Sequence, residues 1–363
     1  MPSSLLSHWT LEPEVAFLNH GSFGACPRPV LAAQAAVRER MEREPVRFFM
    51  QELEPLLDAA REAVAAFVGA DAAGTVFVAN ATMGVNAVVR SLDLAPGDDL
   101  VTTTHAYNAC KNALEYVAAR AGASVVVADV PFPLASDDDV ISAVLAKVGA
   151  RTRLALLDHV TSPTGLVFPI ARLVKEIQAR GVDVLVDGAH APGMLPLDLE
   201  ALGAAYYTGN LHKWVCAPKA VAFLHVREDR RDRVRPTVIS HGANTERADR
   251  PRLWLEFDWM GTFDPSSALA VPEALRFLPT LAGGAWSSVY ASNREKVLAA
   301  RARLCSALDV AAPAPASMIG SLAAVPLPEG FGATRAPCCD GDPLQRALHD
   351  RVRVQVPVTF LPP

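Results

Sequence analysis

The sequence predicts an α/β protein built around a mainly parallel β-sheet that carries helices on both faces. Short apolar runs alternate with amphipathic helical segments through the middle of the chain, which is typical of a doubly wound domain. Most of these runs are apolar at successive positions, as expected of strands buried on both sides. The chain has 363 residues, of which 51% are hydrophobic, so it is long enough for a large core.

Seven apolar runs are the candidate strands of this sheet. In chain order they are residues 75–79, 99–103, 124–130, 153–158, 183–187, 204–208 and 220–226. Between them, residues 111–122 and 171–181 have helical periodicity, and Gly181 is a typical helix C-cap.

The two ends of the chain differ from this alternating middle. Before it, a glycine-containing loop, "LNHGSFGACPRP", precedes a helical segment at 30–43; after it, helical patterns lead into a proline-rich tail. We therefore expect a large domain at 46–265 and a smaller α/β domain made from residues 1–45 and 266–363.

Composition and charge exclude several classes of protein. The net charge is −5, and the densest basic segment, residues 226–235, is interleaved with acids, so it is predicted to be a solvated surface and not a nucleic-acid site. No run is long enough for a bilayer span, and the N-terminus lacks a secretory pattern. The six cysteines show neither metal-ligand nor secreted disulfide spacing. We expect a cytoplasmic protein without a metal site or membrane partner.

Polar residues follow three of the predicted strands, where open parallel sheets bind ligands. Residues 80–84 open a helix after the first strand; its free N–H groups suit a phosphate, although Asn and Thr are also ordinary helix caps. Asp187 ends one strand, and Lys213 follows the next. Alone, these two would be a turn aspartate and a surface lysine. Together, an imine-forming amine, a carboxylate for a pyridinium nitrogen and a phosphate turn meet the needs of pyridoxal phosphate.

Several longer segments carry a family resemblance. They are "FLNHGSFGACPRPV", "EPVRFFMQELEPLLDAAREAVAAFVGA", "VANATMGVNAVVRSL", "DHVTSPTGLVFPI", "VDGAHAPG", "YTGNLHKWVCAPKA" and "WMGTFDPSSALAVPEAL". In these segments the chain resembles the class V aminotransferase group of fold-type I pyridoxal-phosphate enzymes, and within it the isopenicillin N epimerase-like proteins. The segments follow the family's order from about residue 16 to 275.

The resemblance implies a role for each matching residue. Lys213 would form the Schiff base with the cofactor, and Asp187 would pair with its pyridine nitrogen. Phosphate contacts would come from Ala81, Thr82, Asn210 and His212. His190 would lie near the phenolic oxygen, Ser162 would contact cofactor or substrate, and His105 or Tyr107, with Tyr107 preferred, would stack on the ring.

The resemblance also implies an assembly. In related enzymes a "GT" segment crosses a dimer interface to the neighbour's phosphate, and here Gly261 and Thr262 match it. We therefore expect a homodimer with its site at the interface, and an entrance for an amino-acid substrate lined by Asn19, His20 and Ser22.

The sequence departs from the family at two points. It ends before the segment that usually carries the arginine for the substrate carboxylate. Either another arginine substitutes, with Arg28 and Arg335 as candidates, or the substrate differs, or the chain is shortened at its C-terminus and poorly active. Phe263 replaces the arginine of the family's "GTRD". Cys338 and Cys339 precede the position of the desulfurase nucleophile, which makes persulfide chemistry a minor option.

The implied chemistry begins with one step. Lys213 would remove the Cα proton of an amino acid while Asp187 keeps the ring nitrogen protonated. Epimerisation and C–S lyase activity are favoured over the alternatives, a class V aminotransferase or a cysteine desulfurase or desulfhydrase. A protein that binds the cofactor but is catalytically idle is a further alternative. An α/β hydrolase is disfavoured, because the sequence contains no "GxSxG".

Overall fold

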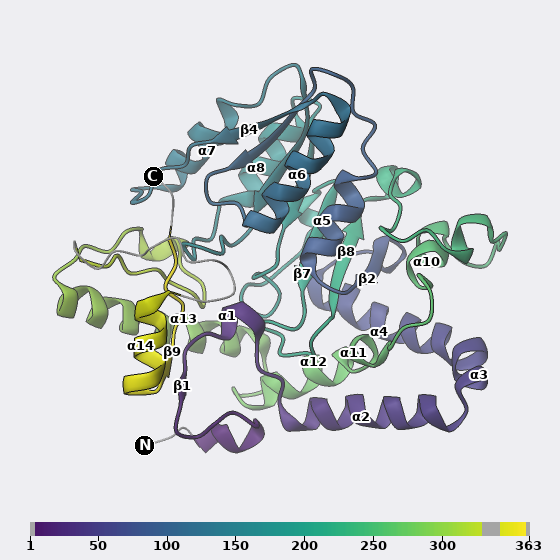
Figure 1. Cartoon of the computed structure of the whole chain (residues 1–363), viewed down its shortest axis with the longest axis horizontal. Helices are drawn as coiled ribbons and strands as arrows, with labels where there is room; N and C mark the ends of the chain where they lie inside the picture. The colour runs from purple at the N-terminus through teal and green to yellow at the C-terminus, as the bar shows by residue number, and fades with distance from the viewer. Residues whose placement is uncertain (1–3, 329–341, 361–363) are drawn as a thin grey trace.

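The computed structural model describes residues 4–328 and 342–360 and has a seven-stranded sheet at its centre (Figure 1). The strand order is β2-β8-β7-β6-β5-β3-β4. The strands are β2 (Thr75–Val78), β3 (Asp99–Thr103), β4 (Ser124–Ala128), β5 (Thr152–Asp158), β6 (Asp183–Asp187), β7 (Tyr206–Asn210) and β8 (Ala222–Val226). β8 runs antiparallel to both of its neighbours, β2 and β7, and all other neighbouring pairs in this sheet are parallel. The predicted mainly parallel sheet is confirmed, and each strand lies within two residues of its expected ends.

Helices cover both faces of the sheet, because most strands are apolar on both sides. On one face, Val85 of α5 (Ala81–Val89) and Leu114 of α6 (Asn108–Ala121) pack with strand residues such as Leu156. On the other face, strand residues such as Leu157 pack against α4 (Leu53–Val68), α7 (Asp137–Leu145) and α8 (Ile170–Gln178). The predicted helices 111–122 and 171–181 are therefore α6 and α8. Gly181 lies in a left-handed turn just beyond the end of α8.

The two flanks of the chain contact each other. The helix α2 (Arg28–Arg43) packs against α11 (Ser266–Leu269) and α12 (Val271–Thr280), along the lower edge of the molecule in Figure 1. The strand β1 (Ala16–Phe17) pairs in parallel with β9 (Val354–Gln355). This contact is compatible with the predicted smaller domain, but the domain boundaries at 45 and 265 stay a prediction.

The other elements are shorter or lie at the surface. The remaining helices are α1 (His20–Phe23), α3 (Pro45–Arg47), α9 (Leu199–Leu202), α10 (Arg252–Phe257), α13 (Trp286–Leu308) and α14 (Pro343–Val352). The segment η2 (Phe48–Glu52) is π-helical, and the 3₁₀ turns are η1 (Ser4–His8), η3 (Ala72–Gly74), η4 (Glu228–Arg233), η5 (His241–Asn244) and η6 (Ala316–Met318). In the described part of the chain, no helix combines the length and hydrophobicity that a membrane crossing needs.

Close packing holds the start of α5 against β7. A Cβ atom at Gly84 would lie 2.3 Å from Thr208 Oγ1 and 2.9 Å from Thr208 Cβ. The Thr208 hydroxyl is itself buried and donates to the Phe223 carbonyl at 2.8 Å, so it has little freedom to move away. The glycine therefore sets how closely the helix N-terminus approaches the sheet.

We predict that Gly84→Ala lowers the free energy of unfolding by about 1–2 kcal/mol. Overpacking costs roughly 1–3 kcal/mol, and the better helix propensity of alanine returns up to about 1 kcal/mol. Urea unfolding measures the change. Gly149→Ala is the control, because a Cβ there meets nothing within 4 Å. Equal effects at the two positions would contradict this account of the α5–β7 contact.

Candidate active site

The carboxyl ends of β5, β6 and β7 bring the principal predicted residues to one edge of the sheet. Asp158 and Asp187 end neighbouring parallel strands and are direct partners in the register. Both continue the side-chain alternation of Leu156 and Leu185, so they lie on the face covered by α5 and α6. Asn210 ends β7, three residues before Lys213. This edge is the candidate site.

Lys213 has an amine held largely out of solvent. Its Nζ lies 2.9 Å from His190 Nε2, and its backbone carbonyl lies 3.0 Å from His20 Nε2. The approach of the N-terminal segment depends on Gly24, where a Cβ would lie 1.9 Å from the His212 carbonyl oxygen. Burial lowers the pKa of Lys213 to about 8, against the opposing effect of the Asp187 charge. Far more of this amine is neutral near pH 7 than in an exposed lysine.

Asp187 is a buried carboxyl with hydrogen-bond donors on both oxygens. Oδ1 accepts from the Ala189 N–H at 2.9 Å, and Oδ2 accepts from the Cys110 thiol at 3.1 Å. Burial raises the pKa of Asp187, while these two hydrogen bonds and the Lys213 charge oppose the rise. The donors therefore favour the ionised form of this carboxyl.

Asp158 adds a second buried carboxyl that our sequence reasoning did not single out. Burial and the charge of Asp187 raise the pKa of Asp158 well above its usual value. Two neighbouring carboxyl groups away from water do not both ionise readily, so Asp158 holds a proton more easily than Asp187 does. The available signal was that both predicted strands, 153–158 and 183–187, end in aspartate.

The N-terminus of α5 is organised by two asparagines. Asn80 caps the helix, with its side-chain oxygen accepting from the Met83 N–H at 2.9 Å. Asn210 Oδ1 accepts from the Ala81 N–H at 2.8 Å. Among the described residues, the Thr82 N–H has no acceptor. The Thr82 amide is therefore available to donate a hydrogen bond to an anion at this turn, whereas the Ala81 amide already donates to Asn210.

The two candidates for ring stacking lie in different environments. His105 is fully buried, with Nδ1 2.8 Å from Thr164 Oγ1 and Nε2 3.1 Å from the Val130 carbonyl oxygen. Tyr107 is the N-cap residue just before α6 and has 46% of its surface exposed. Burial, followed by the charges of Cys110 and Asp187, raises the pKa of Tyr107. His105 is thus enclosed and Tyr107 partly exposed, and the stacking role of either residue stays a prediction.

Four further predicted site residues, His212, Asn19, Ser22 and Ser162, contact other parts of the protein or lie on a loop. His212 Nδ1 lies 3.0 Å from the Val221 carbonyl oxygen. Near the N-terminus, the Ser22 hydroxyl donates to Asn19 Oδ1 at 2.5 Å. Ser162 is partly buried on the loop after β5. Their predicted cofactor and substrate contacts stay predictions.

The residues expected at the dimer interface, and those expected to bind the substrate carboxylate, were not placed at the sheet edge by the contacts described above. Gly261 and the exposed Thr262 are on the loop between α10 and α11. Arg28 donates hydrogen bonds from Nε to the carbonyl oxygens of Ser7 and Trp9, so it stabilises the position of the N-terminal segment. The other candidates, Arg335, Cys338 and Cys339, lie outside the described residues.

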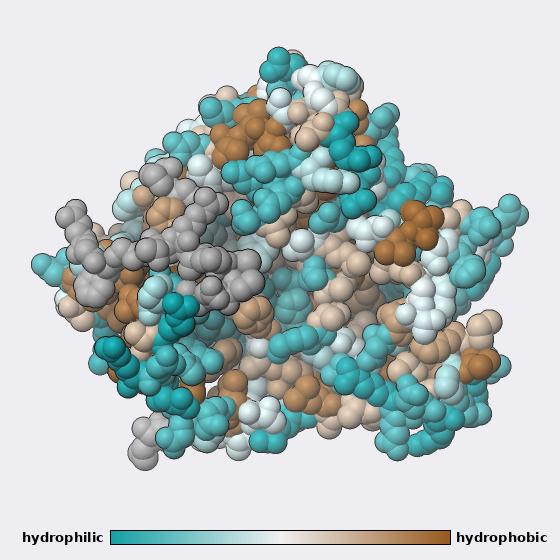
Figure 2. Space-filling view, viewed as in Figure 1, coloured by the Kyte–Doolittle hydropathy of each residue, from teal (hydrophilic) through white to brown (hydrophobic). Residues whose placement is uncertain are grey.

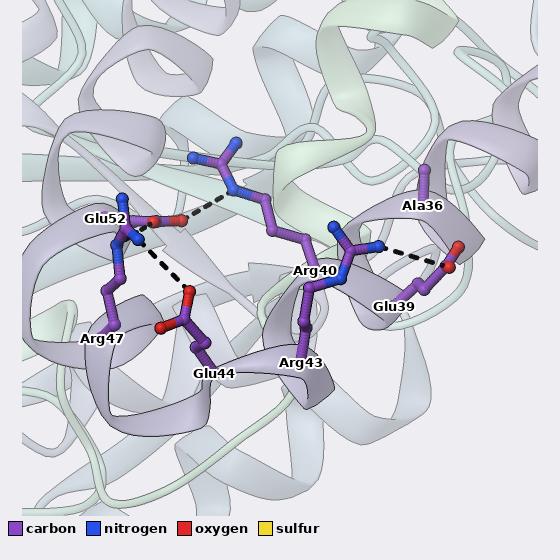
Figure 3. Close-up of a pocket in the computed structure, with 7 residues that line it drawn as sticks. All are labelled: Ala36, Glu39, Arg40, Arg43, Glu44, Arg47 and Glu52. Atoms are coloured by element: carbon purple, nitrogen blue, oxygen red, sulfur yellow. Dashed lines mark hydrogen bonds and ion pairs between the residues drawn. The ribbon is translucent and has the colours of Figure 1, made fainter.

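A surface cavity of about 460 Å³ lies among α2, α3 and η2, and no residue of the candidate site lines it (Figure 3). Its lining residues are Ala36, Glu39, Arg40, Arg43, Glu44, Arg47 and Glu52. The arginines pair with the glutamates, as in the 2.7 Å contact of Arg40 Nε with Glu52 Oε2. Because each guanidinium already has a carboxylate partner, this cavity is a weaker candidate for chemistry than the lysine site.

Residues 26–330 match the family model described as Aminotransferase class-V, and the chain belongs to that family. It is 38% identical to isopenicillin N epimerase of Amycolatopsis lactamdurans, over 97% of this chain and 89% of that protein. It is 37% identical to putative L-cysteine desulfhydrase 1 of Oryza sativa subsp. japonica, over 88% of this chain and 69% of that protein.

A solved structure is similar in fold. It is a mutant of C-DES with glycine covalently linked to its PLP cofactor, which aligns with a TM-score of 0.70 and 23% identity over 81% of this chain and 77% of that chain. The family and this structural neighbour are PLP-dependent.

We predict that the reactivity of the Lys213 amine rises with pH around a midpoint of about 8. Only the neutral amine is nucleophilic, so labelling is slow below this pKa and reaches a plateau above it. Competitive labelling with an amine-selective reagent, read by peptide mass spectrometry, gives the midpoint. Asp187→Asn moves the midpoint lower, because the Asp187 charge stabilises the ammonium form. A midpoint near the ordinary lysine value, 10.5, would refute a desolvated amine.

Proposed function

We propose that this chain is a PLP-dependent enzyme that removes the Cα proton of an amino-acid substrate. The observation that carries the proposal is the Lys213 amine, 2.9 Å from the His190 imidazole and within reach of the Asp187 charge. The membership of the class V family supports it, because the family uses this cofactor.

The groups at the sheet edge fit the cofactor chemically. A neutral amine at Lys213 suits an aldehyde, and a buried carboxylate at Asp187 suits a protonated pyridine nitrogen. The open amide of Thr82, at the start of α5, suits a phosphate. When bound, the cofactor supplies an electron sink for charge that develops at Cα.

Lys213, His190 and Asp187 would have different roles in removing the Cα proton. As a neutral amine, Lys213 can accept the Cα proton, and its lowered pKa places it near the working range of a general base. His190 holds that amine in place. Asp187, whose ionised form Cys110 and Ala189 favour, would stabilise a positive charge on the ring nitrogen of the bound cofactor. These roles are common to several reactions at Cα.

Two outcomes after proton removal fit the relatives best. Return of the proton to the opposite face epimerises the substrate, as the name of the epimerase relative at 38% identity suggests. Loss of a β-sulfur releases sulfide, as the name of the desulfhydrase relative at 37% suggests. The shared first step is the proposal, and product analysis separates the outcomes.

We predict that the purified protein incubated with PLP has a visible absorbance band that Lys213→Ala lacks and Lys219→Ala keeps.

Sulfide and pyruvate from L-cysteine would identify the lyase; solvent deuterium entering Cα with inversion and no sulfide would identify the epimerase. Asp187→Asn should slow either reaction by at least about 100-fold, because the ring nitrogen loses its counterion. A normal band with no reaction across L- and D-amino acids would favour a catalytically idle protein instead.

We also propose that the chain forms a homodimer through the surface beside Thr262. Val46 and Met50 are more than three-quarters exposed, and Phe263 is 40% exposed. The Phe49 ring contacts Trp259, which in turn contacts Phe263, so these three rings form one cluster; Val46 and Met50 are close to Phe49 in the chain. Figure 2 shows hydrophobic atoms at this end of the molecule, around α3. An exposed apolar surface next to a predicted interface residue suits a second copy of the chain.

We predict that light scattering gives about twice the 38.6 kDa chain mass and that Phe263→Asp lowers it. A buried unpaired carboxylate at an interface is unfavourable, so dissociation should follow. Leu304→Asp is the matched control, because Leu304 is 51% exposed on α13, far along the chain from this surface. A monomer that still binds PLP would count against Thr262 completing a neighbour's site.

A further inference from the structure

Two residues that are adjacent in the chain bind opposite nitrogens of one buried imidazole. Lys213 Nζ lies 2.9 Å from His190 Nε2, and Trp214 Nε1 lies 3.4 Å from His190 Nδ1. His190 is 3% exposed, on the loop between β6 and α9. Its hydrogen-bonding groups are therefore both engaged by the segment that carries the reactive lysine.

The indole determines where the imidazole carries its hydrogen. An indole N–H can only donate, so His190 Nδ1 must accept and cannot carry a hydrogen. Burial, helped by the Lys213 charge, lowers the pKa of His190 well below its usual value, so the ring is neutral. A neutral imidazole carries one hydrogen, which is therefore on Nε2. That N–H faces the Lys213 nitrogen, which can accept it only as a neutral amine.

From this geometry we propose that Trp214 is a positioning residue that holds His190 as the Nε2–H tautomer and thereby favours the neutral form of the Lys213 amine. We call the two hydrogen bonds, from Trp214 Nε1–H to His190 Nδ1 and from His190 Nε2–H to Lys213 Nζ, the relay. Its consequence for Cα proton removal rests on the proposed function; the tautomer itself does not.

Packing keeps the indole and the imidazole in this arrangement. A Cβ at Gly21 would lie 3.3 Å from Trp214 Cζ2 and 3.4 Å from His190 Cε1. A Cβ at Gly193 would lie 2.5 Å from the Trp214 backbone carbon. The His20 ring packs on the indole, with centroids 5.4 Å apart. The segments at residues 20–21 and at Gly193 therefore both pack closely against Trp214, which leaves the indole little room to turn its N–H away from His190.

Other charged groups around Lys213 also influence its protonation. The titratable neighbours acting on Lys213 or His190 are Asp187 on β6, Asp158 on β5, Cys110 on α6 and His212 beside Lys213. The carboxyl groups and the thiol favour the ammonium form, opposite to the effect of the relay. A change in Trp214 leaves all of them in place, so its effect isolates the His190 hydrogen bond.

The test compares Trp214→Phe, which keeps an aromatic ring and removes the donor, with Trp286→Phe. Trp286 donates to the Leu275 carbonyl and has no contact with His190, so it is a matched control. The first readout is ¹⁵N NMR of the full chain with labelled histidine, with His190 assigned by its loss in His190→Gln. We expect a hydrogen on Nε2 and none on Nδ1 in the wild type and in Trp286→Phe, and a shift toward Nδ1–H in Trp214→Phe.

The second readout is labelling of the Lys213 amine in full chain treated with hydroxylamine to release any cofactor. Losing a hydrogen bond to the neutral amine raises the pKa of Lys213, so labelling at pH 8 should slow by about 2- to 10-fold in Trp214→Phe. Unchanged tautomer and labelling in this variant would overturn the proposal. If the variant fails to fold, the wild-type spectrum still decides, because a hydrogen on Nδ1 contradicts it. Neither readout needs substrate, so a failure here is separate from failure to bind PLP.

Discussion

Removal of one lysine amine from water is the constraint on which the candidate site depends. Lys213 lies just beyond β7, where the N-terminal segment, the loop after β6 and the end of the sheet close around it. Burial without an adjacent ion-pair partner lowers the pKa of an amine, and here the nearest side chain is a neutral imidazole. The fold thus supplies a nucleophilic nitrogen near neutral pH.

The sheet register places the opposing charge at a controlled position. Asp158 and Asp187 end adjacent parallel strands, so their carboxyl groups compete for ionisation while both act on the same lysine. Cys110 and the Ala189 amide favour ionisation of Asp187, which leaves Asp158 as the easier proton holder. One ionised carboxylate is then available to stabilise a cation, and the Lys213 ammonium form is stabilised by one negative charge and not by two.

The sheet and the principal site residues could be predicted from the sequence because their signals are local. Continuous apolar runs identify buried parallel strands, and a polar residue at the end of such a run lies at the ligand-binding edge. This reasoning singled out Asp187 and Lys213, which the fold brings to that edge, while their roles stay a proposal. The family resemblance then supplied roles that spacing does not contain, such as those of Gly261 and Thr262.

Residues whose importance depends on contacts between distant segments could not be found in this way. The sequence does not indicate that the Cys110 thiol meets Asp187, 77 positions away, or that Trp214 meets His190. The same limit explains the choice left open between His105 and Tyr107. Only the fold shows His105 enclosed by Thr164 and Val130, while Tyr107 stays partly exposed.

The most direct test of a desolvated Lys213 as the cofactor-binding group is to incubate the full chain with pyridoxal phosphate, reduce it with borohydride and map the modified peptides. The account predicts one dominant pyridoxyl adduct, on Lys213, formed without modification of the nearby exposed Lys219. An adduct spread over surface lysines, or none on Lys213, would contradict it.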